Sequence, residues 1–261
     1  MPVGATMTDL LSAATRSVLV TGGSRGIGAA TAWRCAQAGW AVAVNCTRDT
    51  AAAQAVVARI QAAGGTALVV QADVSDEAQV LAMFARIDAE LPPLHGLVNN
   101  AGVVDVGARV DAMSLARWQR MFAINVFGSF LCAREALRRL STRHGGAGGA
   151  IVNLSSAAAR LGSPGQYVDY AAANGAIDTF TLGLAREVAA EGVRVNAVRP
   201  GIIETDIHAS GGQPERVKQL APQVPMQRAG GADEVAQAIV WLLSDAASYT
   251  TGAIIDVAGG R

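Results

Sequence analysis

The sequence predicts an α/β fold, with a single domain built on a parallel sheet that carries helices on both faces. Three observations support this prediction. Short apolar runs of strand length recur along the chain, helical patterns fill the intervals between them, and the first run breaks into three spaced glycines. Strands that are apolar throughout are typical of parallel sheets, because helices cover both faces of such sheets.

About seven strands are expected, alternating with helices. Their predicted ranges are 17–21, 41–45, 67–71, 95–99, 149–154, 193–198 and 253–257. The chain has 261 residues, 51% of them hydrophobic, and can bury one large core. We therefore expect a single domain over 17–261, preceded by a loose N-terminal extension at 1–16.

Two segments interrupt the alternation of strands and helices. The glycine-rich stretch 145–149 lies between a helix and a strand, so it is interpreted as a flexible surface turn and not as a domain linker. Residues 202–231 lack periodicity, are rich in Pro and Gly, and follow the sixth strand. Long loops at the carboxyl end of a strand often cover ligands, so this segment is the candidate substrate lid.

Charge and cysteine content exclude several function classes. The 21 basic and 21 acidic residues give a formal net charge of zero, so no basic face for nucleic acid or membrane is expected, and the partner should be a small molecule. Cys35, Cys46 and Cys132 have neither disulfide-framework nor metal-site spacing, which predicts free thiols and no metal. Without signal-peptide features or an apolar run of about eighteen residues, we expect a cytoplasmic protein.

The first apolar run ends in a glycine-rich loop, Thr-Gly-Gly-Ser-Arg-Gly-Ile-Gly, at residues 21–28. Gly22, Gly26 and Gly28 lack a Cβ, so the backbone can turn tightly, approach a pyrophosphate and begin a helix whose N-terminus points at the anion. The spacing differs from the commoner Gly-x-Gly-x-x-Gly, and such turns also occur without a ligand. The loop indicates a Rossmann-like dinucleotide site that needs support from the rest of the chain.

That support comes from motifs at the ends of later strands. They are Asp73-Val74, Asn99-Asn100-Ala101-Gly102, Ser155-Ser156 and Pro200-Gly201, with Asn125 in a helical segment and Tyr170 after the fifth strand. In this order they resemble the short-chain dehydrogenase/reductase (SDR) family, especially its glucose-dehydrogenase-like and oxoacyl-reductase-like members, along essentially the whole chain. The resemblance implies a doubly wound Rossmann-like sheet and an NAD(P)-dependent oxidoreductase that interconverts a secondary alcohol and a carbonyl. It also implies a homotetramer, or failing that a homodimer, paired through two long helices and the C-terminal region.

The resemblance places the chemistry on Ser156 and Tyr170, with Asn125 beside them. In carbonyl reduction a phenol can supply the proton to the oxygen, and a serine hydroxyl can hold that oxygen in place. Ser155 and Tyr167 are the near alternatives. The Asn-x-x-Ser match and the helical Tyr-Ala-Ala-Ala run favour Ser156 and Tyr170.

One position departs from the family pattern Tyr-x-x-x-Lys, because Asn174 stands four residues after Tyr170. In the family this lysine binds the nicotinamide ribose, and its charge lowers the tyrosine pKa. Asn174 can keep a hydrogen bond to the ribose but carries no charge, and Arg160 is a candidate for the missing cation. Either the enzyme is impaired, or the asparagine is a recent or engineered substitution in a working scaffold, which the intact remaining motifs favour. The alternative function is a nucleotide-binding protein without turnover, acting as a sensor or assembly partner.

Charge favours NADP(H) over NAD(H). NAD enzymes of this kind carry an acid at the end of the second strand, where this chain has Asn45-Cys46 and no acid before Asp49. Arg25 and Arg48 could pair with a 2′-phosphate, although Arg48 could equally be a solvated surface residue.

Other contacts follow from the resemblance. Asp73 and Val74 match residues that bracket adenine, although Asp73 could be a helix cap, as Asp76 is expected to be. Thr205 matches a hydroxyl near the carboxamide. The full set of cofactor-binding candidates is Gly22, Ser24, Arg25, Gly26, Ile27, Gly28, Asn45, Arg48, Asp73, Val74, Asn99, Ala101, Gly102, Pro200, Gly201, Ile203 and Thr205. Substrate contacts could come from Gln166, Tyr167, Ile203, Glu204 and His208, which could also be solvated loop residues.

Overall fold

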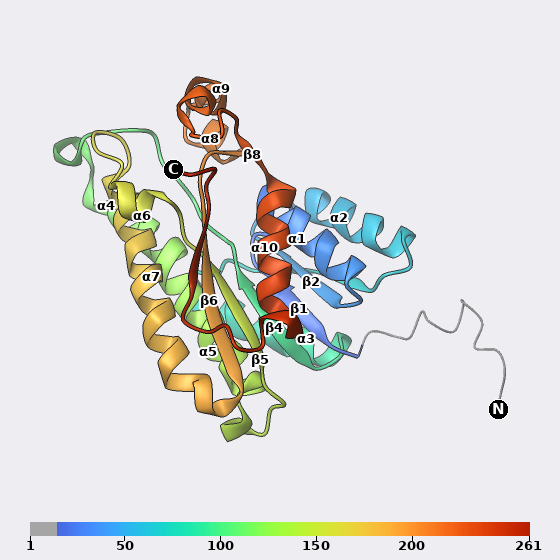
Figure 1. The fold of residues 1–261 in the computed structure, drawn as a ribbon. Helices are drawn as coiled ribbons and strands as arrows, with labels where there is room; N and C mark the ends of the chain where they lie inside the picture. The colour runs from blue at the N-terminus through green and yellow to red at the C-terminus, as the bar shows by residue number, and fades with distance from the viewer. Residues whose placement is uncertain (1–14) are drawn as a thin grey trace, which may run out of the picture.

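A computed structural model describes residues 15–261, and its main sheet contains seven parallel strands (Figure 1). They are β1 (Ser17–Val20), β2 (Ala41–Cys46), β3 (Ala67–Gln71), β4 (Leu94–Asn99), β5 (Gly149–Leu154), β6 (Val193–Pro200) and β9 (Ile254–Val257). Their order across the sheet is β3-β2-β1-β4-β5-β6-β9, which confirms the predicted doubly wound topology. The strand order reverses between β1 and β4, and ligands bind at such a switch point.

Every predicted strand is present, and each end lies within two residues of its predicted position. β1 and β2 are buried along their whole length. Alternate residues of β1 face opposite sides of the sheet, as the two-residue period of a strand requires. Val18 and Val20 belong to one apolar cluster, and Leu19 belongs to the other.

Helices cover both faces of the sheet (Figure 1). One face carries α1 (Gly26–Gln37), α2 (Thr50–Ala62) and α10 (Ala232–Leu243), which bury residues such as Cys35, Ile60 and Ile239 against the strands. The opposite face carries α3 (Glu77–Glu90), α5 (Gly128–Leu140) and α7 (Val168–Val188), which bury Phe84 and Leu184 among others. Each face of the sheet therefore has its own apolar core.

Shorter elements complete the chain around this core. α4 (Leu115–Phe122) continues into a π-helical turn, η2 (Ala123–Phe127), and then into α5. α6 (Ala158–Leu161) precedes α7. The 3₁₀ turns are η1 (Val110–Ala112), η3 (Thr142–His144), η4 (Ala189–Glu191), η5 (Ala221–Gln223) and η6 (Asp245–Ala247).

The segment 202–231 contains β7 (Ile203–Glu204), α8 (Ile207–Ser210), α9 (Arg216–Leu220) and β8 (Gly230–Gly231). β7 and β8 pair in parallel, Ile203 opposite Gly230 and Glu204 opposite Gly231, so the two ends of the segment are held together. α8 and α9 project beyond the sheet at the end where β6 finishes (Figure 1). Each of these elements is too short to produce a periodic sequence pattern, which is why the segment reads as a loop.

The N-terminal extension predicted at 1–16 and the turn predicted at 145–149 lie at the edges of the fold. Of the predicted extension at 1–16, residues 1–14 lie outside the described residues. Arg16 is part of the folded domain: its carbonyl accepts a hydrogen bond from Ala41 N (3.1 Å), and its guanidinium lies 4.4 Å from the centre of the Trp40 ring. At 145–149 the turn is closely packed, since a Cβ at Gly146 would meet the carbonyl oxygen of Arg139 at 2.3 Å.

Within residues 15–261, no helix combines the length and the apolar character needed to cross a membrane.

Candidate active site

A cavity of about 670 Å³ lies where the carboxyl ends of β1, β4 and β5 meet the segment 202–231. Its size falls within the range of roughly 300–1,000 Å³ that is usual for small-molecule sites. All four predicted catalytic residues line it, as do all predicted cofactor-binding residues except Gly28, Asn45 and Asn99. The structure therefore brings together residues that are spread over most of the chain.

The three exceptions support the cavity from behind. The side chain of Asn45 accepts a hydrogen bond from Gly22 N (3.1 Å) and donates to the carbonyls of Val70 and Ala72, so it holds the glycine loop against β3. A Cβ at Gly28 would lie 2.3 Å from the Gly22 carbonyl, so glycine lets α1 begin close to the loop. Asn99 donates to Asn153 and joins β4 to β5.

The glycine loop has the shape that a pyrophosphate requires. Gly22 and Gly26 adopt φ values of 60° and 53°, which favour glycine. At the start of α1 no side chain caps the backbone N–H groups, and no acid occupies the first turn. These donors, together with the positive end of the helix dipole, form an anion site. A Cβ at Gly26 would lie 3.2 Å from Cγ2 of Thr205, so the segment 202–231 reaches this loop.

The end of β2 gives the cavity a cationic corner. Arg25 and Arg48 line it and are exposed. Asp49 lines the same corner, and its carboxylate accepts a hydrogen bond from Ala52 N (3.0 Å) as the N-cap of α2. Asn45 and Cys46 occupy the position where an acid would favour NAD. The corner therefore suits an anionic group.

Asp73 and Asp76 differ in their contacts. Asp73 lines the cavity, and its Oδ1 accepts hydrogen bonds from the backbone N–H (2.9 Å) and hydroxyl (2.6 Å) of Ser75. Asp76 is the N-cap of α3 and accepts from Gln79 N (3.1 Å), which confirms the predicted cap.

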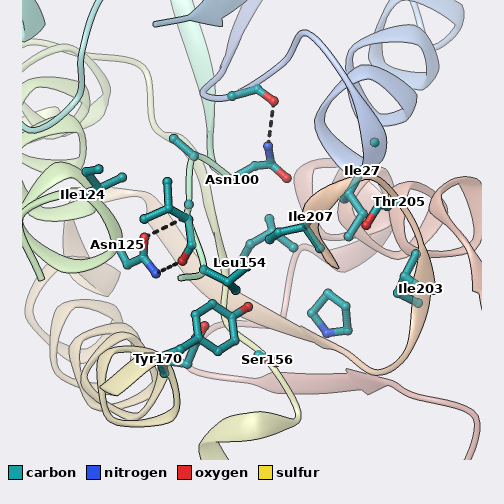
Figure 2. Close-up of a pocket in the computed structure, with 18 of the residues that line it drawn as sticks. Ile27, Asn100, Ile124, Asn125, Leu154, Ser156, Tyr170, Ile203, Thr205 and Ile207 are labelled. Atoms are coloured by element: carbon teal, nitrogen blue, oxygen red, sulfur yellow. Dashed lines mark hydrogen bonds between the residues drawn. The ribbon is translucent and has the colours of Figure 1, made fainter. Parts of the chain in front are cut away.

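Asn125 occupies the π-helical turn, a feature that is frequent at functional sites. Its Oδ1 accepts from Val103 N (2.9 Å), while its Nδ2 donates to the Val103 carbonyl (2.9 Å) (Figure 2). This two-way pairing fixes the backbone that follows the Asn-Asn-Ala-Gly motif. Asn125 is thus a positioning residue for one wall of the cavity.

Ser156 and Tyr170 lie next to each other at the cavity surface (Figure 2). Burial raises the pKa of the Tyr170 phenol above its ordinary value, and hydrogen bonding from Ser156 and Asn174 only partly opposes this. The alternatives are engaged elsewhere: Ser155 Oγ donates to the Asn174 carbonyl (3.3 Å), and Tyr167 lies under the guanidinium of Arg216. The hydroxyls of Ser156 and Tyr170 therefore lie side by side at the cavity surface.

Asn174 lines the cavity beside this pair, and its Nδ2 donates to the Tyr170 carbonyl (2.8 Å). Arg160 does not replace the family lysine. It donates to the Arg261 carbonyl (2.8 Å), pairs with Asp256 (3.2 Å) and is not among the residues that line the cavity. The side chains that oppose the burial effect on the Tyr170 pKa, Ser156 and Asn174, are both neutral.

Comparison with known proteins agrees with this geometry. A family model described as enoyl-(acyl carrier protein) reductase matches residues 22–261. The chain belongs to the short-chain dehydrogenase/reductase family. As in other SDR oxidoreductases, the nucleotide-binding and catalytic motifs are parts of one domain.

Two SDR relatives and one solved SDR structure illustrate the range of similarity. The uncharacterized oxidoreductase YgfF of Escherichia coli (strain K12) is 60% identical over 243 residues, which cover 93% of this chain and 98% of YgfF. The 3-oxoacyl-[acyl-carrier-protein] reductase FabG of Staphylococcus aureus (strain Mu50) is 37% identical, with coverage of 94% and 98%. A crystal structure of a short-chain dehydrogenase from Burkholderia cenocepacia in complex with NADP is 32% identical, has a TM-score of 0.86, and covers 95% of this chain and 98% of that one.

Several residues of this SDR cavity were missed by sequence reasoning. Arg216 and Arg261 both line it, and no motif links positions so far apart. Among the suggested substrate contacts, Tyr167 and Ile203 line the cavity, whereas Glu204 is exposed and not among its lining residues. The side chain of His208 lies outside the described part of the structure.

The chain has three thiols, one of which lies at the cavity. Cys35, Cys46 and Cys132 are unpaired, as predicted, and the structure buries all three. Burial raises the pKa of Cys35 and of Cys132 to about 12. Cys46 lines the cavity at the end of β2, and burial raises its pKa as well.

Proposed function

We propose that this protein is an NADP(H)-dependent oxidoreductase that interconverts a secondary alcohol and a carbonyl. The observation that carries the proposal is the pair of hydroxyls, Ser156 and Tyr170, in the cavity that the glycine loop also lines. When bound, the nicotinamide cofactor supplies or accepts the hydride. The chain's own residues would handle the oxygen and its proton.

The roles of these residues follow from their contacts. Ser156 Oγ accepts a hydrogen bond from Ala158 N (3.1 Å), and its hydroxyl proton, which now faces the Tyr170 phenol, would turn to hold a substrate oxygen. The Tyr170 hydroxyl, next to it, would donate the proton in reduction and accept it in oxidation. Asn125 fixes the wall formed by Val103. Asn174 would offer its amide to a cofactor ribose in place of the family lysine.

The raised pKa of Tyr170 affects both directions of the reaction at neutral pH. The phenol keeps its proton, as a donor to a carbonyl oxygen must. Oxidation of an alcohol needs the phenolate as base, which is scarce well below the pKa. Because the overall equilibrium is fixed by thermodynamics, a penalty on oxidation at one pH is shared by reduction. We infer that Asn174 impairs catalysis.

The preference for NADP(H) rests on the corner formed by Arg25 and Arg48, where Asp49 is engaged in capping α2. Guanidinium groups pair well with phosphate. The similar structure from Burkholderia cenocepacia is described as a complex with NADP, which is consistent with this choice.

A second candidate function is favoured by one observation, the neutral Asn174 at the position of the family lysine. In that case the protein binds the nucleotide and does not turn it over, and it acts as a sensor or assembly partner. The glycine loop and the cationic corner serve this function equally well.

The experiment that separates the two follows NADPH absorbance with a panel of ketones and aldehydes, beside a titration of NADPH binding. Turnover that falls by a factor of about a hundred or more in both Ser156→Ala and Tyr170→Phe, with unchanged NADPH affinity, supports the oxidoreductase. Tight binding without turnover of any carbonyl supports the second function. Weak binding of both nicotinamide cofactors contradicts both.

Three further proposals concern the molecule as a whole. The segment 202–231 acts as the substrate lid, because its paired ends place α8 and α9 beside the cavity. The protein assembles as a homotetramer or homodimer through the outer face of α5 and α7. It works in the cytoplasm on a small molecule.

A further inference from the structure

Two arginines from segments far apart in the chain line the same cavity, and the charge of one influences the other. Arg216 belongs to α9, and Arg261 follows the strand β9. The C-terminal end of the chain lies at the same end of the sheet as α8 and α9 (Figure 1). The backbone joins the segment 202–231 to the residues just before Arg261, since Met226 N donates to the Gly259 carbonyl at 3.1 Å. Both arginines line the cavity that holds Tyr170.

Arg216 is held by neutral groups. Its Nη1 donates to the side-chain oxygens of Gln166 (2.5 Å) and Gln213 (2.7 Å), and its guanidinium lies 5.1 Å from the centre of the Tyr167 ring. Burial, together with the like charge of Arg261, lowers the pKa of Arg216. These contacts orient the guanidinium without neutralising it, so its charge is available to a ligand.

Arg261 carries a buried nitrogen without an acceptor. Among residues 15–261, its Nη1 is one of four buried side-chain nitrogen or oxygen atoms that make no hydrogen bond. A buried donor that lacks an acceptor is costly, and the cost is higher for a charged group. Its backbone is fixed, because Arg160 donates to its carbonyl and pairs with Asp256. An anionic oxygen in the cavity would give this nitrogen its missing partner.

The other charged side chains that line the cavity differ from these two arginines in their partners or their position. Arg120 also lines it but is paired with Asp105 at 3.1 Å. The segment 202–231 contributes one carboxylate to the lining, that of Asp206. Arg25 and Arg48 lie at the glycine loop and at the end of β2. The region of Arg216 and Arg261 is therefore a separate cationic end of the same cavity.

This cationic end lies on the catalytic side. Gln166 and Tyr167, which contact Arg216, precede Tyr170 by only four and three residues. An anion bound there would stand next to the proton donor and away from the pyrophosphate cradle. A planar guanidinium presents paired N–H donors that match the two oxygens of a carboxylate.

We propose that the substrate carries a carboxylate as well as its carbonyl or alcohol group, and that Arg216 and Arg261 bind this carboxylate. The proposal rests on the oxidoreductase function proposed above and adds the substrate class to it. The enzyme is then an oxoacid or hydroxy-acid oxidoreductase, and the anion sets which end of the molecule reaches Tyr170.

The kinetic test compares each acid with its own neutral ester. Probes are the ketones 4-acetylbenzoate against methyl 4-acetylbenzoate, and 4-oxopentanoate against methyl 4-oxopentanoate, with NADPH in excess. We expect kcat/KM to favour the acids by about tenfold to a hundredfold, mainly through a lower KM. In Arg216→Gln and in Arg261→Gln this acid-to-ester ratio should fall towards one, and Arg216→Lys should keep part of it.

A matched control removes one positive charge from the same short helix. Lys218 in α9 is mostly exposed and pairs with Glu215 at 2.9 Å, so Lys218→Gln should keep the full acid-to-ester ratio. A ratio that falls equally in Lys218→Gln would indicate a general field effect and would overturn the assignment. Equal kcat/KM for acids and esters in the unmodified protein would overturn it too, while leaving the oxidoreductase function intact.

A binding measurement keeps the proposal testable without turnover. Titration calorimetry of the NADPH-loaded protein with benzoate and with benzamide should give binding of benzoate alone, and Arg216→Gln should weaken it by about tenfold or more. Comparable binding of the two ligands, or benzoate binding that survives both arginine substitutions, would refute the carboxylate site. If no carbonyl is reduced but benzoate binds through these arginines, the proposed function fails and the anion site stands.

Discussion

The side-chain amide of Asn174 donates a 2.8 Å hydrogen bond to the backbone carbonyl of Tyr170, one helical turn earlier. The amide therefore satisfies a helix carbonyl beside the phenol that we propose as the proton donor, at a position that lines the cavity. Burial is the largest influence on the Tyr170 pKa and raises it. An active-site tyrosine without a neighbouring cation is the central chemical property of this chain.

Restoring the charge with Asn174→Lys should raise turnover by roughly tenfold to a thousandfold, the range that general acid–base catalysis commonly supplies. A unit charge about 4–5 Å from the phenol, at an effective dielectric constant of about 20, is worth some 3–4 kcal/mol before screening. The charge favours the phenolate and so lowers the pKa of Tyr170. The measurement is kcat for reduction and oxidation, with Asn174→Met as the control of similar length and no charge.

The pH profile of alcohol oxidation should change in the same variant. Since the pKa of Tyr170 is raised above the ordinary value of about 10, the phenolate fraction of the unmodified protein still increases through pH 10. The oxidation rate should rise without a plateau up to that pH. In Asn174→Lys the plateau should move to lower pH. An unchanged rate and profile in that variant would mean that Tyr170 is not the titrating group.

Arg117 forms a buried ion pair with Asp169, the residue that precedes Tyr170. Arg117 donates to both carboxylate oxygens of Asp169, at 2.7 and 3.1 Å, and to the Val106 carbonyl at 2.5 Å. Asp169→Asn leaves the arginine charge buried without its partner, which should cost about 3–5 kcal/mol in the free energy of unfolding. Denaturant unfolding measures this cost, and kcat should fall because the start of α7 loses its anchor to α4.

The pair Arg120–Asp105 provides the comparison for that prediction. It joins similar groups at 3.1 Å, but 56% of the arginine side chain and 29% of the aspartate side chain are exposed. Asp105→Asn should therefore cost at most about 1 kcal/mol. Similar losses in the two variants would show that burial does not determine the strength of the Arg117–Asp169 pair.

The strands were predictable because a parallel sheet covered on both faces leaves uninterrupted apolar runs, such as β2 and β5. The site residues at strand ends were predictable from their order, which matches one family. Three features had no signal in the sequence. In the sequence, the π-helical turn around Asn125 looks like ordinary helix, and Asn45 and Asn99 give no indication that they support the cavity from behind. Only the tertiary fold brings Arg216 and Arg261 to the same cavity.

The outer face of α5 and α7 offers an apolar surface for self-association. Phe127 and Phe130 are 58% and 42% exposed, and the Phe130 ring stacks on Phe180 with a centroid distance of 3.8 Å. Apolar side chains grouped in this way mark interaction sites. Phe130→Glu should shift the sedimentation of the protein at micromolar concentration from a tetramer or dimer towards the monomer. Leu81→Glu on α3, where leucine is also 42% exposed, is the control and should not change the assembly. Sedimentation of the unmodified protein as a monomer would contradict the prediction.

NADPH should bind more tightly than NADH, by about tenfold to a hundredfold, because a charge-assisted contact to a phosphate is worth roughly 1.5–3 kcal/mol. The contact falls on Arg25 and Arg48, which line the cavity and are exposed, so the preference should decrease as salt is added. Arg25→Ala should weaken NADPH binding much more than NADH binding. Arg143→Ala is the matched control, because it removes the same charge from the turn η3 before β5, at the opposite end of the strands from the cavity, where Arg143 is mostly exposed. Equal affinities for the two cofactors at physiological salt, or a preference that persists unchanged in Arg25→Ala and Arg48→Ala together, would exclude this corner as the 2′-phosphate site.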